Sequence, residues 1–317
     1  MRIVFCGTPE FGLPTFRRLL AEPDFMIEAV VTQPDRPRGR GQEVSAPVLK
    51  GAAVSAGVAV YQPEKIRSEA ALEFFQRVAP DAVVIIAYGQ IIPKRLIDIP
   101  RLGWINLHAS LLPKYRGAAP INWAIVNGES TSGLTTMQID AGMDTGPILL
   151  QRTLEIGKDE TAPQLAVRMS EAGAPLMIDS LRRLDGGEIF PQAQDSAQAS
   201  LAPKLEKEHG RVDWSQTAQQ IYNRIRGLVP WPGAYTTFRG KLCHIWGHVS
   251  ESATAASSMV PGTIFAGGGS VYVVCGDGSC LSLEAAHIEG RKRVSAREFV
   301  SGARLGPGER FGEKAGE

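Results

Sequence analysis

Asn106 and His108 stand two residues apart at the end of an apolar run, Gly103–His108. Side chains two positions apart in a strand point to the same face, so both would lie together at the strand's carboxyl end. An asparagine amide and an imidazole can each donate a hydrogen bond to an oxygen that gains negative charge. The pair could therefore polarise a carbonyl and stabilise a tetrahedral intermediate. It could equally well satisfy loop backbone groups, and the two residues alone do not decide between these roles.

The second candidate is a pair of aspartates, Asp140 and Asp144, in the stretch QIDAGMDTG. Aspartates four apart would share one face of a helix, but Gly142 and Gly146 favour a loop. In a loop, Asp144 could reach back and orient His108, as an acidic partner does in other histidine-dependent acyl transfers. It could also bond its own backbone as an Asx turn, and the spacing leaves both possibilities open.

Short apolar runs alternate with amphipathic stretches through the first half of the chain. The apolar runs span Arg2–Cys6, Glu28–Thr32, Ala82–Tyr88, Gly103–His108 and Leu134–Ile139, and the amphipathic stretches span Pro14–Ala21, Ser68–Ala79, Ile121–Val126 and Thr161–Leu184. This alternation predicts an α/β domain with a Rossmann-like, mostly parallel sheet and helices on both faces. The first run leads into GTPEFG, which is neither GxGxxG nor a P-loop, so dinucleotide binding has little support.

The composition changes after Gly187. The small, polar stretch PQAQDSAQASLAP predicts a linker. Strand-like segments follow at Tyr235–Val249, Gly262–Phe265, Ser270–Cys275 and Cys280–Leu283, with a hairpin signal at Asp277-Gly278 and a closing helix over Ser295–Ala303. An antiparallel barrel or sandwich fits this pattern, and we predict a small OB-like β-barrel. The predicted organisation is a catalytic domain over 1–189, a linker over 190–207 and a C-terminal domain over 208–317.

The composition excludes several classes of protein. The chain has 317 residues and a formal net charge of +1, with 34 Lys and Arg against 33 Asp and Glu. It contains no stretch of roughly 20 apolar residues, and no leader-like segment precedes the first strand-like run, so we expect a cytoplasmic protein without a membrane partner. The residues Cys243, His244, His248, Cys275 and Cys280 fit no common zinc spacing, and we expect no metal.

Several motifs together resemble a known family. They are IVFCGTPEFG at 3–12, TQPDRPRGRG at 32–41, INLHASLLPKYRGAAPINWAI at 105–125, IDAGMDTGPIL at 139–149 and RIRGLVPWPGAYTTF at 224–238. Over nearly the whole chain the sequence resembles the 10-formyltetrahydrofolate-dependent formyltransferases. The PDRPRGRG loop and the PWPGAY segment are similar to the members of that family that act on methionyl-tRNA.

The resemblance implies a reaction and a set of site residues. The reaction is transfer of a formyl group from N10 of 10-formyltetrahydrofolate to the α-amine of methionine on initiator tRNA, by a monomer that needs no protein partner. The catalytic trio falls on Asn106, His108 and Asp144. The turn used against the folate falls on Ser110, Leu111, Leu112 and Pro113, and the segment lining the pterin pocket falls on Ile86, Ala87, Tyr88, Gly89 and Gln90.

A tRNA would have to bind at local patches of positive charge, because the net charge of the whole chain is close to zero. The loop at 32–41 carries Arg36, Arg38 and Arg40 against Asp35, and the resemblance places Arg40 near the acceptor end of the tRNA. Residues 203–248 carry seven Lys and Arg against three Asp and Glu. From these we predict RNA contacts at Lys204, Lys207, Arg224, Arg226, Arg239 and Lys241, although a solvated or salt-bridged face is an equally ordinary use of such residues.

Three functions are alternatives to formylation of methionyl-tRNA. Formylation of a small amine, such as a glycinamide ribonucleotide or an amino sugar nucleotide, is disfavoured by the basic loop and the second domain. A non-catalytic RNA-binding protein is disfavoured by the intact Asn106, His108 and Asp144. Hydrolysis of 10-formyltetrahydrofolate stays open, because water could replace the amine at the same site.

Overall fold

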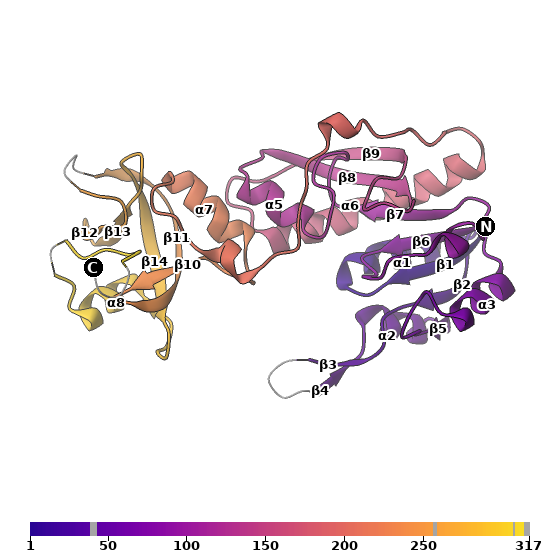
Figure 1. Cartoon of the computed structure of the whole chain (residues 1–317), viewed down its shortest axis with the longest axis horizontal. Coiled ribbons are helices and arrows are strands. Elements are labelled where there is room, and N and C mark those ends of the chain that lie inside the picture. Colours follow the sequence, from indigo (N-terminus) through magenta and orange to yellow (C-terminus); the bar gives the residue numbers. More distant parts are fainter. Residues whose placement is uncertain (39–42, 256–258, 307, 314–317) are drawn as a thin grey trace. The chain divides into compact units, whose positions relative to one another are not determined.

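The chain divides into two compact units. The computed structural model describes residues 1–38, 43–255, 259–306 and 308–313 (Figure 1). Unit 1 comprises residues 1–120, 131–155 and 164–203, and unit 2 comprises residues 121–130, 156–163 and 204–317. Within the described ranges, no helix combines the length and the apolar character needed to cross a membrane.

Unit 1 is built on a seven-stranded sheet in the order β5-β2-β1-β6-β7-β8-β9. The strands are β1 (Arg2–Gly7), β2 (Met26–Val31), β5 (Ala59–Tyr61), β6 (Ala82–Ile86), β7 (Trp104–His108), β8 (Thr131–Gln138) and β9 (Ile148–Glu155). The first five strands in the order are parallel, while β8 is antiparallel to β7 and β9 is antiparallel to β8. The predicted mostly parallel, Rossmann-like sheet is confirmed. A separate hairpin pairs β3 (Arg36–Arg38) with β4 (Glu43–Ser45).

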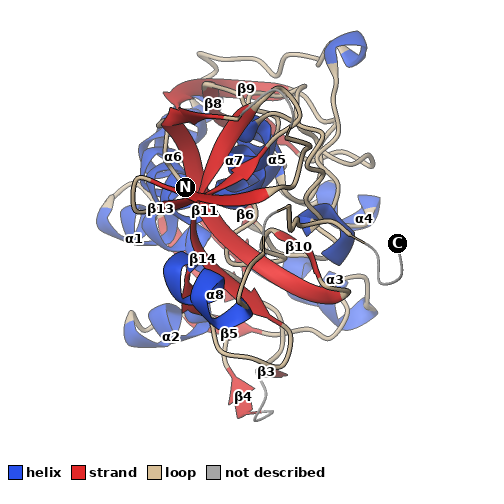
Figure 2. Cartoon of the chain, turned by 90° about the vertical axis from the view of Figure 1, so that its left-hand side faces the viewer, coloured by secondary structure: helices blue, strands red, loops and turns tan. Residues whose placement is uncertain are grey.

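Helices cover both faces of this sheet (Figure 2). They are α1 (Leu13–Ala21), α2 (Val48–Ser55), α3 (Glu69–Val78), α4 (Lys94–Ile97) and α6 (Ala162–Asp185), with a short 3₁₀ turn over Glu10–Gly12. On one face, Phe5 of β1 packs edge-on against Phe16 of α1, and Leu107 of β7 closely approaches Gly173 of α6. On the other face, Phe75 of α3 packs on Trp104 of β7, with the ring centroids 5.1 Å apart.

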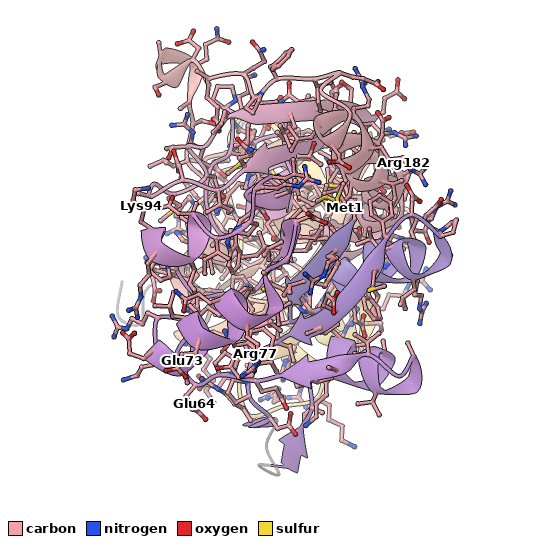
Figure 3. All side chains as sticks on the ribbon, turned by 90° about the vertical axis from the view of Figure 1, so that its right-hand side faces the viewer. Met1, Glu64, Glu73, Arg77, Lys94 and Arg182 are labelled. Atoms are coloured by element: carbon pink, nitrogen blue, oxygen red, sulfur yellow. The ribbon has the colours of Figure 1, made fainter. Side chains whose placement is uncertain are left out.

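Charged side chains tie the ends of these elements together at the surface. Arg182 of α6 donates to Asp24 Oδ1 at 2.7 Å, and the amino group of Met1 donates to the Asp24 carbonyl at 2.6 Å. Figure 3 shows Arg182 and Met1 close together at this end of unit 1. The turn before β2 therefore connects the start of β1 to the last turns of α6.

Unit 2 contains an antiparallel sheet in the order β10-β11-β14-β13-β12, with β15 paired to β14. Its strands are β10 (Tyr235–Phe238), β11 (Lys241–Thr254), β12 (Ile264–Gly267), β13 (Ser270–Val274), β14 (Ser279–Ile288) and β15 (Val294–Ser295). Its helices are α5 (Pro120–Val126), α7 (Ala218–Gly227) and α8 (Ala296–Ala303), and short 3₁₀ turns occur over Ser196–Gln198 in unit 1 and Lys207–Gly210 in unit 2. The predicted antiparallel domain is confirmed. Residues 309–312 hydrogen-bond to both ends of this strand order, to Ile264 of β12 and to Thr237 of β10.

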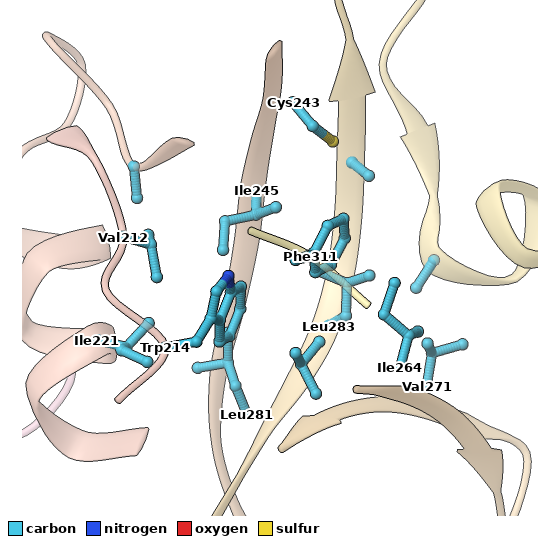
Figure 4. Close-up of a cluster of buried hydrophobic side chains, with 14 of the residues drawn as sticks. Val212, Trp214, Ile221, Cys243, Ile245, Ile264, Val271, Leu281, Leu283 and Phe311 are labelled. Carbon is cyan, nitrogen blue, oxygen red and sulfur yellow. The ribbon is translucent and has the colours of Figure 1, made fainter. Parts of the chain in front are cut away.

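The core of unit 2 lies between this sheet and the helices α7 and α8. Trp214 stacks on Phe311 with the ring centroids 5.6 Å apart, and both lie among Ile221, Ile245 and Leu281 (Figure 4). The Trp214 indole donates to a buried threonine hydroxyl of β10. Burial of this many large apolar side chains is what stabilises a small sheet domain.

Candidate active site

Asn106 and His108 lie on the same face of β7, as their spacing predicts. Asn106 pairs with Ile85 of β6, and Ile85 belongs to the same buried cluster as Trp104, so this is the face covered by α3 and α4. His108 is 6% exposed, whereas Asn106 is half-buried. Within the described ranges, no group hydrogen-bonds the Asn106 side-chain amide. A strand-end amide without a protein partner is suited to bind a ligand oxygen.

Asp144 lies beside His108, which ends β7, although β8 ends next to the start of β7. Gln138, the last residue of β8, pairs with Ile105 near the start of β7, so residues 139–147 have to fold back along the strand. They do so, and Asp144 Oδ2 lies 3.7 Å from His108 Nδ1. Gly146 permits this path, because a Cβ there would lie 1.8 Å from the Gln138 carbonyl oxygen.

The two aspartates of this loop take different roles. Asp140 accepts hydrogen bonds from the Gly142 backbone at 2.9 Å and from the Thr145 hydroxyl at 2.7 Å, which closes the loop on itself as an Asx turn. Asp144 instead accepts from the backbone N–H of Gly117 at 2.8 Å. Its φ of +52° lies in the left-handed region, which aspartate tolerates better than most residues. The loop thus turns the Asp144 carboxylate toward the histidine.

The hydrogen bonds of His108 determine which ring nitrogen faces this carboxylate. Nε2 lies 2.9 Å from the carbonyl oxygen of Tyr115. A carbonyl oxygen only accepts, so Nε2 carries the hydrogen in this contact. Nδ1 is then an acceptor in the neutral ring, and it donates to Asp144 or to a substrate oxygen only when the ring is protonated.

The turn after β7, Ser110–Pro113, is fixed by the neighbouring strand β8. The Thr135 hydroxyl donates to the Ser110 carbonyl at 2.7 Å and accepts from the Leu112 backbone at 3.1 Å. The Ser110 hydroxyl donates to the Lys114 carbonyl at 2.6 Å, so this side chain shapes the turn. Leu111 packs on Gly133 of β8, where a Cβ would lie 2.5 Å from Leu111 Cδ2. The turn is therefore a rigid platform directly after His108.

The segment after β6, Ile86–Gln90, is held by bonds from three other parts of unit 1. The Tyr88 carbonyl accepts from the Thr8 hydroxyl at 3.3 Å and from the Gln33 amide at 3.0 Å. Gln90 Oε1 accepts from the backbone of Ile66 at 2.8 Å. Burial raises the pKa of the Tyr88 phenol well above its usual range, so the ring is neutral. Ala87 and Gly89 both have a positive φ within this tight bend.

A cavity of about 510 Å³ opens at the carboxyl ends of β1, β2 and β6. The strand order reverses between β1 and β6, which is where open α/β sheets bind ligands. The cavity is lined by Thr8, Gln33, Pro34, Arg36, Ser45, Pro47, Glu64, Tyr88, Gly89 and Gln90. Sequence reasoning did not single out Thr8 and Gln33 of this lining, although Gln33 directly follows a predicted strand and Thr8 lies two residues after one.

The predicted RNA contacts occupy different environments. Arg36 lines the cavity just described, Arg40 lies outside the described residues, and nothing is described of the Arg38 side chain. Lys204, Lys207 and Lys241 are exposed in unit 2.

Arg224 and Arg226 of α7, in contrast, are engaged within unit 2. Arg224 donates to the His209 carbonyl at 2.5 Å, and Arg226 donates to the carbonyls of Gly157 and Glu160 at 3.1 and 2.9 Å. Burial lowers the pKa of both guanidinium groups. Arg239 pairs with Glu309. Of the six contacts predicted in unit 2, the three lysines and Arg239 are therefore exposed, whereas Arg224 and Arg226 are not.

The cysteines and histidines of unit 2 do not converge. Cys243, Cys275 and Cys280 are buried thiols, and His248 bonds Glu284 at 2.9 Å. Across the part of the chain that the structure describes, no group of three or more His, Cys, Asp or Glu is placed to hold a metal ion.

Comparison with known proteins places these features in a family. The pattern of formyl transferases matches residues 1–181, and that of the formyl transferase C-terminal domain matches residues 204–304. The chain belongs to the formyl transferase family. A methionyl-tRNA formyltransferase of Solibacter usitatus is 50% identical to this formyl transferase over 313 residues, which is 99% of each chain.

Two solved structures share the fold. An N-formyltransferase from Helicobacter canadensis, in complex with folinic acid and dTDP-3-aminofucose, superposes on 89% of this chain with a TM-score of 0.64 at 18% identity. HypX from Aquifex aeolicus, in complex with tetrahydrofolic acid, superposes on 98% of this chain, which corresponds to 48% of HypX, with a TM-score of 0.61 at 18% identity. The superposition on the Helicobacter canadensis protein extends beyond the residues of unit 1.

Proposed function

We propose that this formyl transferase transfers a formyl group from N10 of 10-formyltetrahydrofolate to the α-amine of methionyl-initiator tRNA, giving N-formylmethionyl-tRNA for translation initiation. The observation that carries the proposal is the 50% identity, over 99% of both chains, to a methionyl-tRNA formyltransferase. The solved N-formyltransferase from Helicobacter canadensis is only 18% identical, so the likeness supports the shared fold and no inference about the substrate.

The reaction needs stabilisation of the negative charge on the formyl oxygen more than it needs a strong base. The attacking α-amine titrates near pH ~8, so a useful fraction is already neutral at pH 7. Its nitrogen forms a bond to the formyl carbon, and the formyl oxygen gains negative charge. We assign the side-chain amide of Asn106 as a donor to that oxygen, because it lies on the same face of β7 as His108. Nδ1 of His108 is the second donor when the ring is protonated, with the Asp144 carboxylate balancing its charge.

Proton transfer completes the reaction. When the bond from the formyl carbon to N10 breaks, the amine has lost one proton and N10 has gained one. Asp144, 3.7 Å from His108 Nδ1, orients the ring and collects the proton that the amine loses. The Gly117 backbone N–H keeps this carboxylate in place while its charge changes.

Two segments of unit 1 are suited to hold the folate. The segment Ile86–Gln90 would line the pterin pocket, and the turn Ser110–Pro113 would contact the cofactor beside the reacting formyl group. Both are rigid backbone platforms at neighbouring strand ends, which supports this placement.

The RNA would contact both units of a monomeric, cytoplasmic enzyme. In the loop at 32–41 we assign Arg36, Arg38 and Arg40, and in the second unit Lys204, Lys207, Arg239 and Lys241. Arg224 and Arg226 are not exposed, and each donates to backbone carbonyl oxygens within unit 2, so we leave these two out of the RNA surface. For the functional division we propose a catalytic domain over 1–189, a linker over 190–207 and a tRNA-binding domain over 208–317.

The test is a formyl-transfer assay with 10-formyltetrahydrofolate and four acceptors. They are methionyl-initiator tRNA, methionyl-elongator tRNA, dTDP-3-aminofucose and water. Product on initiator tRNA, with little on the others, supports the proposal. Transfer to the amino sugar nucleotide alone, or folate turnover without any acceptor, would overturn it in favour of a sugar formyltransferase or a hydrolase.

A further inference from the structure

The polar segment that the composition marks as a linker lies against the candidate active site. Its backbone pairs with β9 through Gln192 and Ile148, which exchange hydrogen bonds of 2.8 and 2.7 Å. Further along, Ser200 and Ala202 pair with the backbone of Arg116, at 2.8 and 2.7 Å. Residues 192–202 therefore run across both loops that carry the candidate catalytic groups.

Between these two anchor points, Gln194 uses both ends of its side-chain amide. Nε2 donates to the carbonyl oxygens of Asp144 and Gly146, at 2.9 and 2.7 Å. Oε1 accepts from Nε and Nη2 of Arg116, at 3.0 and 2.8 Å. An amide supplies one acceptor end and one donor end, so this arrangement permits a single orientation of the group. One side chain thus joins the Asp144 loop to the segment that follows β7.

Arg116 makes this connection costly to break. Its side chain is 8% exposed, and among the described residues no carboxylate pairs with it. A buried guanidinium needs acceptors held in place, since leaving it unsatisfied incurs a large desolvation penalty. Its chain neighbours supply the two backbone contacts of the site: the Tyr115 carbonyl accepts from His108, and the Gly117 N–H donates to Asp144.

We propose that Gln194 is a positioning residue for this site, which it serves by holding Asp144 and the Arg116 segment in register around His108. Gln194 does not touch the reacting atoms. It acts through the backbone of the aspartate and through Arg116, so its loss displaces the Asp144 carboxylate from His108 Nδ1. The inference deepens the proposed function, because it rests on the roles assigned there to Asp144 and His108.

The variants that test the proposal are Gln194→Ala and Gln194→Glu, with Gln198→Ala as the matched control. Glutamate keeps the shape and the acceptor for Arg116, but it turns an oxygen toward the two carbonyls that glutamine binds as a donor. Gln198 lies four residues further on, is exposed, and bonds only the nearby Asp195 among the contacts that the structure describes. We expect both Gln194 variants to lower kcat about 10- to 100-fold with little change in KM for the tRNA, and Gln198→Ala to retain the parent kcat.

A double variant separates positioning from general destabilisation. Gln194→Ala introduced into Asp144→Asn should reduce kcat no further than Asp144→Asn alone, because both changes act on one carboxylate. Multiplicative losses, or a rise in KM for tRNA with kcat unchanged, would overturn the proposal. A kcat of Gln194→Glu equal to that of the parent enzyme would overturn it as well.

Amide hydrogen exchange provides a measurement that needs no turnover. The Gly117 N–H is protected by Asp144, so Gln194→Ala should accelerate its exchange, while Gln198→Ala should leave it unchanged. Unchanged protection at Gly117 in Gln194→Ala contradicts the positioning role whatever the substrate is. An inactive parent enzyme with the expected exchange pattern would instead refute the proposed function and keep the structural connection.

Discussion

The backbone N–H of Gly117 donates to Asp144 Oδ2 over 2.8 Å, and the same carboxylate oxygen lies 3.7 Å from Nδ1 of His108. Gly117 belongs to the segment that follows β7, whereas Asp144 belongs to the loop that follows the antiparallel strand β8. One backbone donor therefore connects two loops that approach the histidine from different strands. The position of the carboxylate depends on this contact as much as on its own loop.

Asp144→Asn should reduce turnover by about 10²- to 10⁴-fold, the usual contribution of a positioned acid or base. Asparagine keeps the shape but can neither accept the proton of the amine nor neutralise a protonated His108. Binding of tRNA should remain near the parent value, so single-turnover rates and tRNA affinity should be measured together. Asp140→Asn is the control, because Asp140 bonds only its own loop among the described contacts. Equal rate losses in the two variants would contradict the assignment.

Gly117→Ala should damage both the fold of unit 1 and the site. Gly117 has φ of +123°, which side chains rarely adopt, and an added Cβ would lie 2.6 Å from the Ala202 carbonyl oxygen. We expect a loss of stability of about 1–3 kcal/mol together with a lower kcat. Gly57→Ala is the matched control, since its φ is +70° and a Cβ there meets nothing within 4 Å. Thermal midpoints and kcat of both variants check this, and equal effects on kcat would refute the link to the site.

The strands that the sequence predicted are the buried ones. The runs at Arg2–Cys6, Ala82–Tyr88 and Gly103–His108 correspond to β1, β6 and β7, whose side chains are almost entirely buried. The edge strand β9 was not predicted, because its sequence ILLQRTLE mixes exposed polar residues into the run. Helix α7, with the sequence AQQIYNRIRG, was also missed, although its buried residues Ala218, Ile221 and Ile225 recur at helical spacing. Hydrophobic periodicity detects buried faces and weakens where an element is half exposed.

The site was predictable as residue types but not as geometry. The spacing of Asn106 and His108 gave their common face, because a strand has a fixed period. No local rule predicts that residues 139–147 fold back along β7 and choose Asp144 over Asp140 as the partner of the histidine. Gln194 lies in a stretch of small and polar residues typical of a linker, so its contacts could not be predicted from the composition.

Asn106→Ala should separate activity from stability. Loss of one oxyanion donor typically lowers the rate about 10²- to 10³-fold. The Asn106 amide has no hydrogen-bond partner among the described groups, so the thermal midpoint should stay within about 2 °C of the parent or rise. His108→Ala should lose activity and also stability, because it removes the buried 2.9 Å bond to the Tyr115 carbonyl. A marked fall in stability of Asn106→Ala would show that the amide has a structural role.

Binding of tRNA should distinguish exposed lysines from buried arginines in unit 2. Lys207→Gln and Lys241→Gln should each weaken binding and lower the slope of log affinity against log salt by about 1, if each neutralises one phosphate. Arg226→Gln should mainly destabilise unit 2, since its donors bind the carbonyls of Gly157 and Glu160. Titrations at several salt concentrations check this. A smaller slope of log affinity against log salt in Arg226→Gln, without a loss of stability, would show that Arg226 contacts the RNA.

Asp81→Asn should make the stability of unit 1 less dependent on pH. The backbone N–H of Arg2 donates to Asp81 at 2.7 Å and Arg101 donates at 3.0 Å, and these bonds lower the pKa of the carboxyl below its usual value. The unfolded chain, with an Asp pKa of about 3.9, therefore binds a proton before the folded chain does as the pH falls. The stabilisation is present above pH ~4 and is lost as the pH falls through the lower, folded-state pKa.

At pH 7 the Asp81→Asn variant should be less stable than the parent by about 1–2 kcal/mol, and this difference should shrink as the pH falls below ~4. Urea midpoints at pH 7, 5, 4 and 3 measure it. Asp98→Asn is the control, because Asp98 forms an exposed pair with Lys94 one helical turn away and such pairs contribute a few tenths of a kcal/mol. A difference for Asp81→Asn that stays constant down to pH 3 would show that shape, and not the charge of the carboxylate, accounts for its effect at the start of β1.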